Sequence, residues 1–79
     1  MKYRLEGLII EAIDNYVRVS VGGYVGVTQK QCPTATEVSS MLKEMQGYWP
    51  NRAQMQACGR AADDAYRNNE CDNLSAYRF

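Results

Sequence analysis

Residues 3–29 are largely apolar, with few residues in succession before a polar side chain or a glycine, and this pattern is taken to predict β-strands joined by tight turns. Two residue pairs interrupt the pattern, Asp14-Asn15 and Gly22-Gly23, and both tolerate the positive φ that tight type I′ hairpin turns require. The segments between them are rich in Val, Ile and Tyr, which fit a pleated surface. The pattern predicts a three-stranded antiparallel meander with strands at about 3–13, 16–21 and 24–29.

The turns also predict which residues lie opposite each other. Around Asp14-Asn15, Ile13 faces Tyr16 and Glu11 faces Arg18, so an opposite-charge pair lies directly across two strands. One face of the sheet is then the core face, with Leu8, Ile10, Ala12, Val17, Val19, Val21 and Tyr24. The other face is mixed, with Ile9, Glu11, Ile13, Tyr16, Arg18, Ser20, Val25 and Val27.

Backbone geometry explains the glycines of this region. Gly22-Gly23 forms a turn, and Gly26, opposite Val19, leaves room on the core face for another element. A phosphate-binding loop needs glycines that run into a helix N-terminus, whereas these run into a strand. A helix over the start of the chain competes, but an internal glycine and several β-branched residues disfavour it. Its helical spacing rests on Leu5, Leu8, Ile9, Ala12, Ile13 and Tyr16.

The stretch EGLIIEAIDNYVRVSVGGYVGV, residues 6–27, resembles the first three strands of bacterial OB-fold RNA-binding domains of the ribosomal and translation-initiation kind. The shared features are a glycine before the first strand, a short turn and a Gly-x-x-Gly third strand. In that family, exposed aromatic and basic residues of the second and third strands stack on bases. The resemblance implies such a role for Tyr16, Arg18 and Tyr24.

Residues 34–68 change to a helical period. Thr34 and Glu37 fit a capping box, an apolar stripe follows, and Gly47 is a natural stop, so the pattern predicts a helix over 35–46. The stripe, interpreted as core, consists of Val38, Met41, Leu42 and Met45. Beyond Pro50, Asn51 and Gln54 fit a second N-cap, which predicts a helix over 52–68. Its inward face carries Met55, Cys58, Ala61, Ala62, Ala65 and Tyr66.

These elements predict a single α+β domain over 1–79: a sheet over 3–29, a three-stranded antiparallel meander, followed by two helices packed on one face (βββαα). The C-terminal tail, 69–79, is polar with late apolar residues. The pattern leaves open whether this tail docks on the domain.

Composition narrows the classes of function. The 79 residues carry nine basic and nine acidic side chains, and the absence of a basic excess disfavours direct nucleic-acid binding. The chain shows neither a signal-peptide pattern nor an apolar run long enough to span a membrane, so we expect a cytoplasmic protein without a membrane partner. Cys32, Cys58 and Cys71 fit neither a disulfide framework nor a zinc motif. Free structural thiols are the favoured interpretation, and a Cys32–Cys71 bridge is the alternative.

The chemistry of the chain predicts no catalytic residue, no metal site and no cofactor. It contains no histidine that could activate a serine or a thiol. Asp63 and Asp64 are adjacent on a predicted helix, so they point about 100° apart and do not converge as a carboxylate pair. Cys58 lies on a predicted buried face, where a thiol is inert. We therefore expect a protein that is not an enzyme.

Surface aromatics favour a protein-binding module, because six tyrosines and one tryptophan exceed what so small a core can hold. The candidate partner-binding residues are Glu11, Tyr16, Arg18, Val25, Val27, Tyr48 and Trp49. The size and build resemble small phage-encoded inhibitors of bacterial defence, anti-CRISPR proteins among them. That resemblance implies a protein of the host-cell cytoplasm that blocks a surface of a larger protein or protein–nucleic acid complex, such as a CRISPR effector. There are two alternatives. One is a regulator that binds nucleic acid through the exposed face of its sheet, and the other is a structural homo-oligomer, such as a homodimer.

Overall fold

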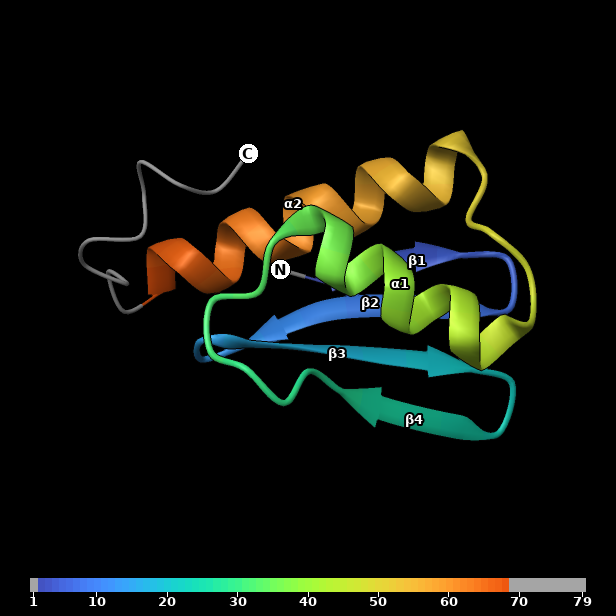
Figure 1. Ribbon diagram of the computed structural model, residues 1–79, viewed down its shortest axis with the longest axis horizontal. Coiled ribbons are helices and arrows are strands. Elements are labelled where there is room, and N and C mark those ends of the chain that lie inside the picture. The colour runs from blue at the N-terminus through green and yellow to red at the C-terminus, as the bar shows by residue number, and fades with distance from the viewer. Residues whose placement is uncertain (1, 69–79) are drawn as a thin grey trace.

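The computed structural model describes residues 2–68, which form an antiparallel four-stranded sheet followed by two helices (Figure 1). The elements are β1 (Lys2–Leu5), β2 (Leu8–Ile13), β3 (Tyr16–Val21), β4 (Tyr24–Val27), α1 (Ala35–Gln46) and α2 (Arg52–Asn68). The strands lie side by side in chain order, β1-β2-β3-β4. The fold is α+β, as the sequence predicts, and the question of a docked tail falls on residues outside the described range.

The prediction of three strands is wrong, because the segment expected to be one strand over 3–13 is a hairpin. The chain turns at Glu6-Gly7, where Gly7 adopts a φ of 72°, and Leu5 pairs with Leu8. A glycine reaches this left-handed region without the steric cost that a Cβ would add. Folding back gives the outer edge of β2 a hydrogen-bonded partner, which a single long strand would lack.

The predicted register of the central strands is confirmed. Glu11 pairs with Arg18 and Val19 pairs with Gly26. The last strand ends at Val27 instead of the predicted residue 29. There, the Thr28 hydroxyl accepts a hydrogen bond from the Val17 amide at 3.1 Å, in place of a backbone carbonyl, and the chain leaves the sheet.

Both helices begin at the expected capping boxes. The Thr34 hydroxyl accepts from the Glu37 amide at 3.1 Å, and the Glu37 carboxylate accepts from the Thr34 amide at 2.8 Å. Asn51 and Gln54 exchange the equivalent pair of bonds at 2.9 Å each. These bonds satisfy amides that a helix N-terminus otherwise leaves unpaired. At Gly47, with a φ of 91°, α1 ends in the left-handed region.

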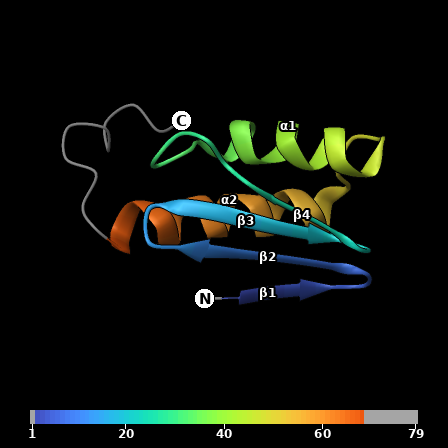
Figure 2. The same cartoon turned by 90° about the horizontal axis from the view of Figure 1, so that it is seen from below.

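The core lies between one face of the sheet and both helices. α2 packs across β1, β2 and β3, whereas α1 packs on β3 and β4 (Figures 1 and 2). The small residues of α2 allow its close approach. The buried core consists of Leu8, Ile10, Val17, Val19, Val38, Leu42, Ala57, Cys58, Ala61, Ala62 and Ala65. No helix among residues 2–68 covers the opposite face of the sheet, which we call the open face.

Candidate functional site

The open face displays alternate residues from all four strands. Cross-strand pairing arranges them in rows, of which one runs from Lys2 through Glu11 and Arg18 to Val27. A second row runs from Arg4 to Val25 across the sheet. The face comprises Lys2, Arg4, Ile9, Glu11, Ile13, Tyr16, Arg18, Ser20, Val25 and Val27. The structure therefore brings five of the seven predicted partner-binding residues onto one surface.

An ion-pair network crosses the middle of this face. The Arg18 guanidinium donates two hydrogen bonds to Glu11 Oε1, one of them from Nε at 3.1 Å, and Lys2 Nζ lies 4.0 Å from Glu11 Oε2. The hydrogen bond from Arg18 holds the pKa of Glu11 below its ordinary value, assisted by the positive charges of Arg18 and Lys2 and opposed by burial. Arg18 is thus committed to a bond within the sheet. A partner that used this guanidinium would have to compete with Glu11.

The most exposed apolar side chains of the sheet lie on β4. Tyr24, Val25 and Val27 are 76%, 64% and 50% exposed, whereas Tyr16 is half-buried. The assignment of Tyr24 to the core is wrong. This tyrosine lies on the helix side of the sheet by alternation, opposite Val21, but at the end of the strand where no described element covers it. Tyr24 therefore does not share a face with Tyr16 and Arg18.

The outer edge of β4 also carries unpaired backbone groups. In an antiparallel ladder, residues alternate between those that bond to the neighbouring strand and those that point away from it. The Thr28 amide bonds to the Val17 carbonyl at 3.0 Å, so alternation turns Gly26 and Tyr24 towards β3. The amides and carbonyls of Val25 and Val27 consequently point outwards, and no strand of the described residues pairs with them.

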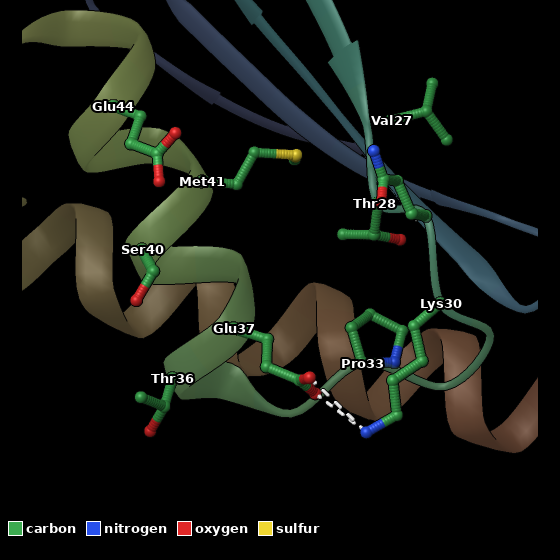
Figure 3. Close-up of a pocket in the computed structure, with 10 residues that line it drawn as sticks. Val27, Thr28, Lys30, Pro33, Thr36, Glu37, Ser40, Met41 and Glu44 are labelled. Atoms are coloured by element: carbon green, nitrogen blue, oxygen red, sulfur yellow. Dashed lines mark hydrogen bonds and ion pairs between the residues drawn. The ribbon is translucent and has the colours of Figure 1, made fainter.

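A groove of about 450 Å³ lies between α1 and the segment that leaves β4 (Figure 3). Met41 projects from α1 towards this segment, and an ion pair between Lys30 and Glu37, with Nζ and Oε2 3.3 Å apart, bridges the two walls (Figure 3). Glu44 lines the groove one turn of helix beyond Met41 and has no ion-pair partner within residues 2–68. The sequence interpretation assigned Met41 to the core, and Met41 is partly buried against the core while it also lines this groove. Neither sequence spacing nor composition signals this groove, because it is built by elements that only the fold brings together.

Tyr48 and Trp49, the other two predicted partner-binding residues, lie in the loop between the helices and are 61% and 60% exposed. Lys43 Nζ lies 5.3 Å from the centre of the Trp49 ring, a cation–π arrangement. This loop and the β1–β2 and β3–β4 turns lie at the same end of the molecule (Figures 1 and 2). The loop belongs to the helical layer, so these two aromatics form a surface separate from the open face.

The cysteines differ from the favoured prediction. Cys58 is a buried free thiol, and burial raises its pKa, although a hydrogen bond with Ser39 opposes the shift. Cys32 is disulfide-bonded, which contradicts a set of three free thiols. The alternative Cys32–Cys71 pairing involves a residue outside the described range.

Within residues 2–68, no group of three or more acidic or cysteine side chains is placed to hold a metal ion. The two adjacent carboxylates of α2 have separate partners: Asp63 pairs with Arg67 at 3.1 Å, and Asp64 accepts a hydrogen bond from the Tyr3 hydroxyl at 2.7 Å. That bond to Asp64 raises the pKa of Tyr3. None of the helices in this part of the chain combines the length and apolar character needed to cross a bilayer.

Comparison with protein-family models, with curated proteins and with solved structures found no match to this chain.

Proposed function

We propose that this chain is a non-enzymatic protein-binding module whose contact surface is β4 and the adjoining open face. The observation that carries the proposal is the concentration of exposed apolar side chains on β4, where three of the four residues are large and exposed. Burying such side chains against a partner gains about 25 cal/mol for each Å² of apolar surface removed from water. A pleated edge rich in valine and tyrosine is well suited to that contact.

The class of partner follows from size and build. The size and build of the chain resemble those of the small phage-encoded inhibitors of bacterial defence, which act by occupying a surface of something larger. We propose this class for the protein, with a defence complex such as a CRISPR effector as its target. Blocking a recognition surface requires affinity and shape, and it requires no group transfer by the inhibitor.

The geometry gives less support to the nucleic-acid alternative. Base stacking along a strand needs aromatic and basic side chains on one face. Here Tyr24 lies on the other face from Tyr16, and Arg18 is bonded to Glu11. The chain also carries no net charge with which to gain affinity from phosphates.

Affinity capture from the source organism tests the proposal, with mass spectrometry of the co-eluting proteins. Val25→Lys places a charge in the proposed contact and leaves the core untouched, so we expect at least a tenfold loss of captured partner. Trp49→Lys makes the same kind of change in the loop between the helices, and we expect it to retain capture. Loss of capture by Trp49→Lys with retention by Val25→Lys would move the contact to the helical layer and overturn the proposal.

A further inference from the structure

The two edges of the sheet differ in a way that points to strand pairing at one of them. β1 carries Lys2 and Arg4 at its edge, and edge charges of this kind hinder pairing with another chain. β4 reads Tyr-Val-Gly-Val, with no charge and no proline to block a new strand. Charged side chains and prolines are two ways in which proteins block such an edge, and β4 has neither, so an added strand can pair with it.

The backbone of β4 offers defined bonding positions. The outward-pointing amides and carbonyls of Val25 and Val27 supply two donors and two acceptors to an extended segment. Gly26, between them, bonds towards β3. A segment laid along this edge would continue the sheet as a fifth strand and bury parts of both valine side chains.

The groove beside β4 specifies the chemistry of that segment. Met41 offers an apolar contact, and Glu44, three residues further along α1, offers a carboxylate without an ion-pair partner among the described residues. Positions three apart on a helix lie about 5–6 Å apart, close to the ~6.6 Å between residues two apart in a strand. An apolar residue and a Lys or Arg separated by one position would therefore reach both.

We propose that β4 is a strand-addition site for an extended segment of the partner protein, with an apolar residue over Met41 and a Lys or Arg at Glu44. This proposal rests on the protein-binding function and adds the mode of recognition and the chemistry of the ligand. Main-chain bonds to an exposed edge supply affinity in such sites, and the pockets for alternate side chains supply specificity.

A second copy of the chain fits this edge less well. Antiparallel pairing of two β4 strands about Gly26 would bring the two α1 helices side by side across the junction. Glu44 lines the groove without an ion-pair partner among the described residues, so this pairing would add a like charge from each copy near the junction. A basic segment of another protein meets the same carboxylate with the opposite charge.

A display library of random twelve-residue linear peptides, selected against the purified protein, tests the proposal. We expect enriched peptides to carry an apolar residue and a Lys or Arg separated by one position. Their affinity should fall about tenfold for Glu44→Lys and remain unchanged for Glu6→Lys. The control makes the same change of charge in the exposed β1–β2 turn, away from β4.

Backbone contact is tested separately from charge. The cysteines at 32 and 58 permit assembly of the chain by ligation, so Val25 can be introduced with an N-methyl group that removes its donor. We expect this variant to lose at least tenfold in affinity for the selected peptides. In the unmodified protein, bound peptide should slow hydrogen exchange at the amides of Val25 and Val27.

The outcomes separate this proposal from the broader function. Failure to enrich any peptide, or peptides that leave exchange at Val25 and Val27 unchanged, would overturn strand addition. If strand addition is overturned but Val25→Lys still abolishes capture of the natural partner, the protein-binding function remains supported. A concentration-dependent dimer with slow exchange at both valines in the free protein would assign the edge to a second copy and overturn the peptide as occupant.

Discussion

Gly26 determines how closely α1 approaches the sheet. A Cβ built on this glycine would lie 2.9 Å from Met45 Sδ and 3.8 Å from Met41 Sδ. The sulfur of Met45 therefore occupies the space that a side chain at position 26 would fill. The sequence predicted a close approach at this glycine, and the structure identifies Met45 as the group that makes it.

We predict that Gly26→Val destabilises the fold by about 1 kcal/mol, at the low end of overpacking costs, because its Cβ must displace the flexible end of the Met45 side chain. Urea unfolding followed by circular dichroism measures the change. Gly23→Val adds the same side chain where a Cβ meets nothing within 4 Å, so it should cost much less. Equal losses at both positions would show that the close contact has no energetic weight.

The same contact should appear as coupling between positions 26 and 45. Met45→Ala removes the sulfur, so the cost of Gly26→Val should be smaller in the Met45→Ala background by more than about 0.5 kcal/mol. Additive effects of the two substitutions would contradict this packing arrangement.

At the scale of elements, the capping box links the start of α1 to pH. The bond from the Thr34 amide, aided by Lys30, holds the pKa of Glu37 below its ordinary value, against the effect of burial. A lowered pKa in the folded state means that the stabilisation is complete above the ordinary pKa of a glutamate, about 4.3. This stabilisation is lost as the pH falls through the lowered value. Glu11 shifts in the same direction, so both groups predict weakening in acid.

We predict that Glu37→Gln flattens the dependence of the unfolding free energy on pH below about pH 4.5. Urea unfolding at pH 7, 4 and 3 gives the comparison. Glu44→Gln removes the same charge from the same helix without touching the capping box, and it reports the effect of net charge alone. If both substitutions reduce the slope of the unfolding free energy against pH equally, the acid sensitivity comes from net charge and the capping box has no specific role in it.

Local signals in the sequence predict the elements well where a residue has one geometric role. Thr34 and Glu37 mark the start of α1, and two-residue turns set the register of β2, β3 and β4. The prediction of one strand over 3–13 failed at Gly7, because a glycine within an apolar segment is compatible with both a strand and a turn. The hairpin is decided by the need of β2 for a second partner, which is a property of the whole sheet.

At the scale of the whole molecule, the candidate site is less predictable than the fold. Alternation places Glu11, Arg18, Val25 and Val27 on one face, but it does not reveal that Arg18 is committed to Glu11. The groove at Met41 and Glu44 depends on how α1 crosses β4, and no local pattern encodes that distance. Only the assembled layers show that the exposed apolar surface is concentrated at one edge.

The β4 edge of the assembled sheet should differ from the centre of the sheet in hydrogen exchange. β2 and β3 each lie between two hydrogen-bonded neighbours and beneath the helices. Their amides that bond to a neighbouring strand should therefore exchange only when the whole domain unfolds. On β4 we predict an alternation: Tyr24 and Gly26, which bond towards β3, exchange slowly, whereas Val25 and Val27 exchange much faster. Nuclear magnetic resonance of the ¹⁵N-labelled full chain at low concentration resolves the four amides individually. Equally slow exchange at all four would mean that the edge is already occupied in the isolated chain, and a partner strand could then bind only by displacing what covers it.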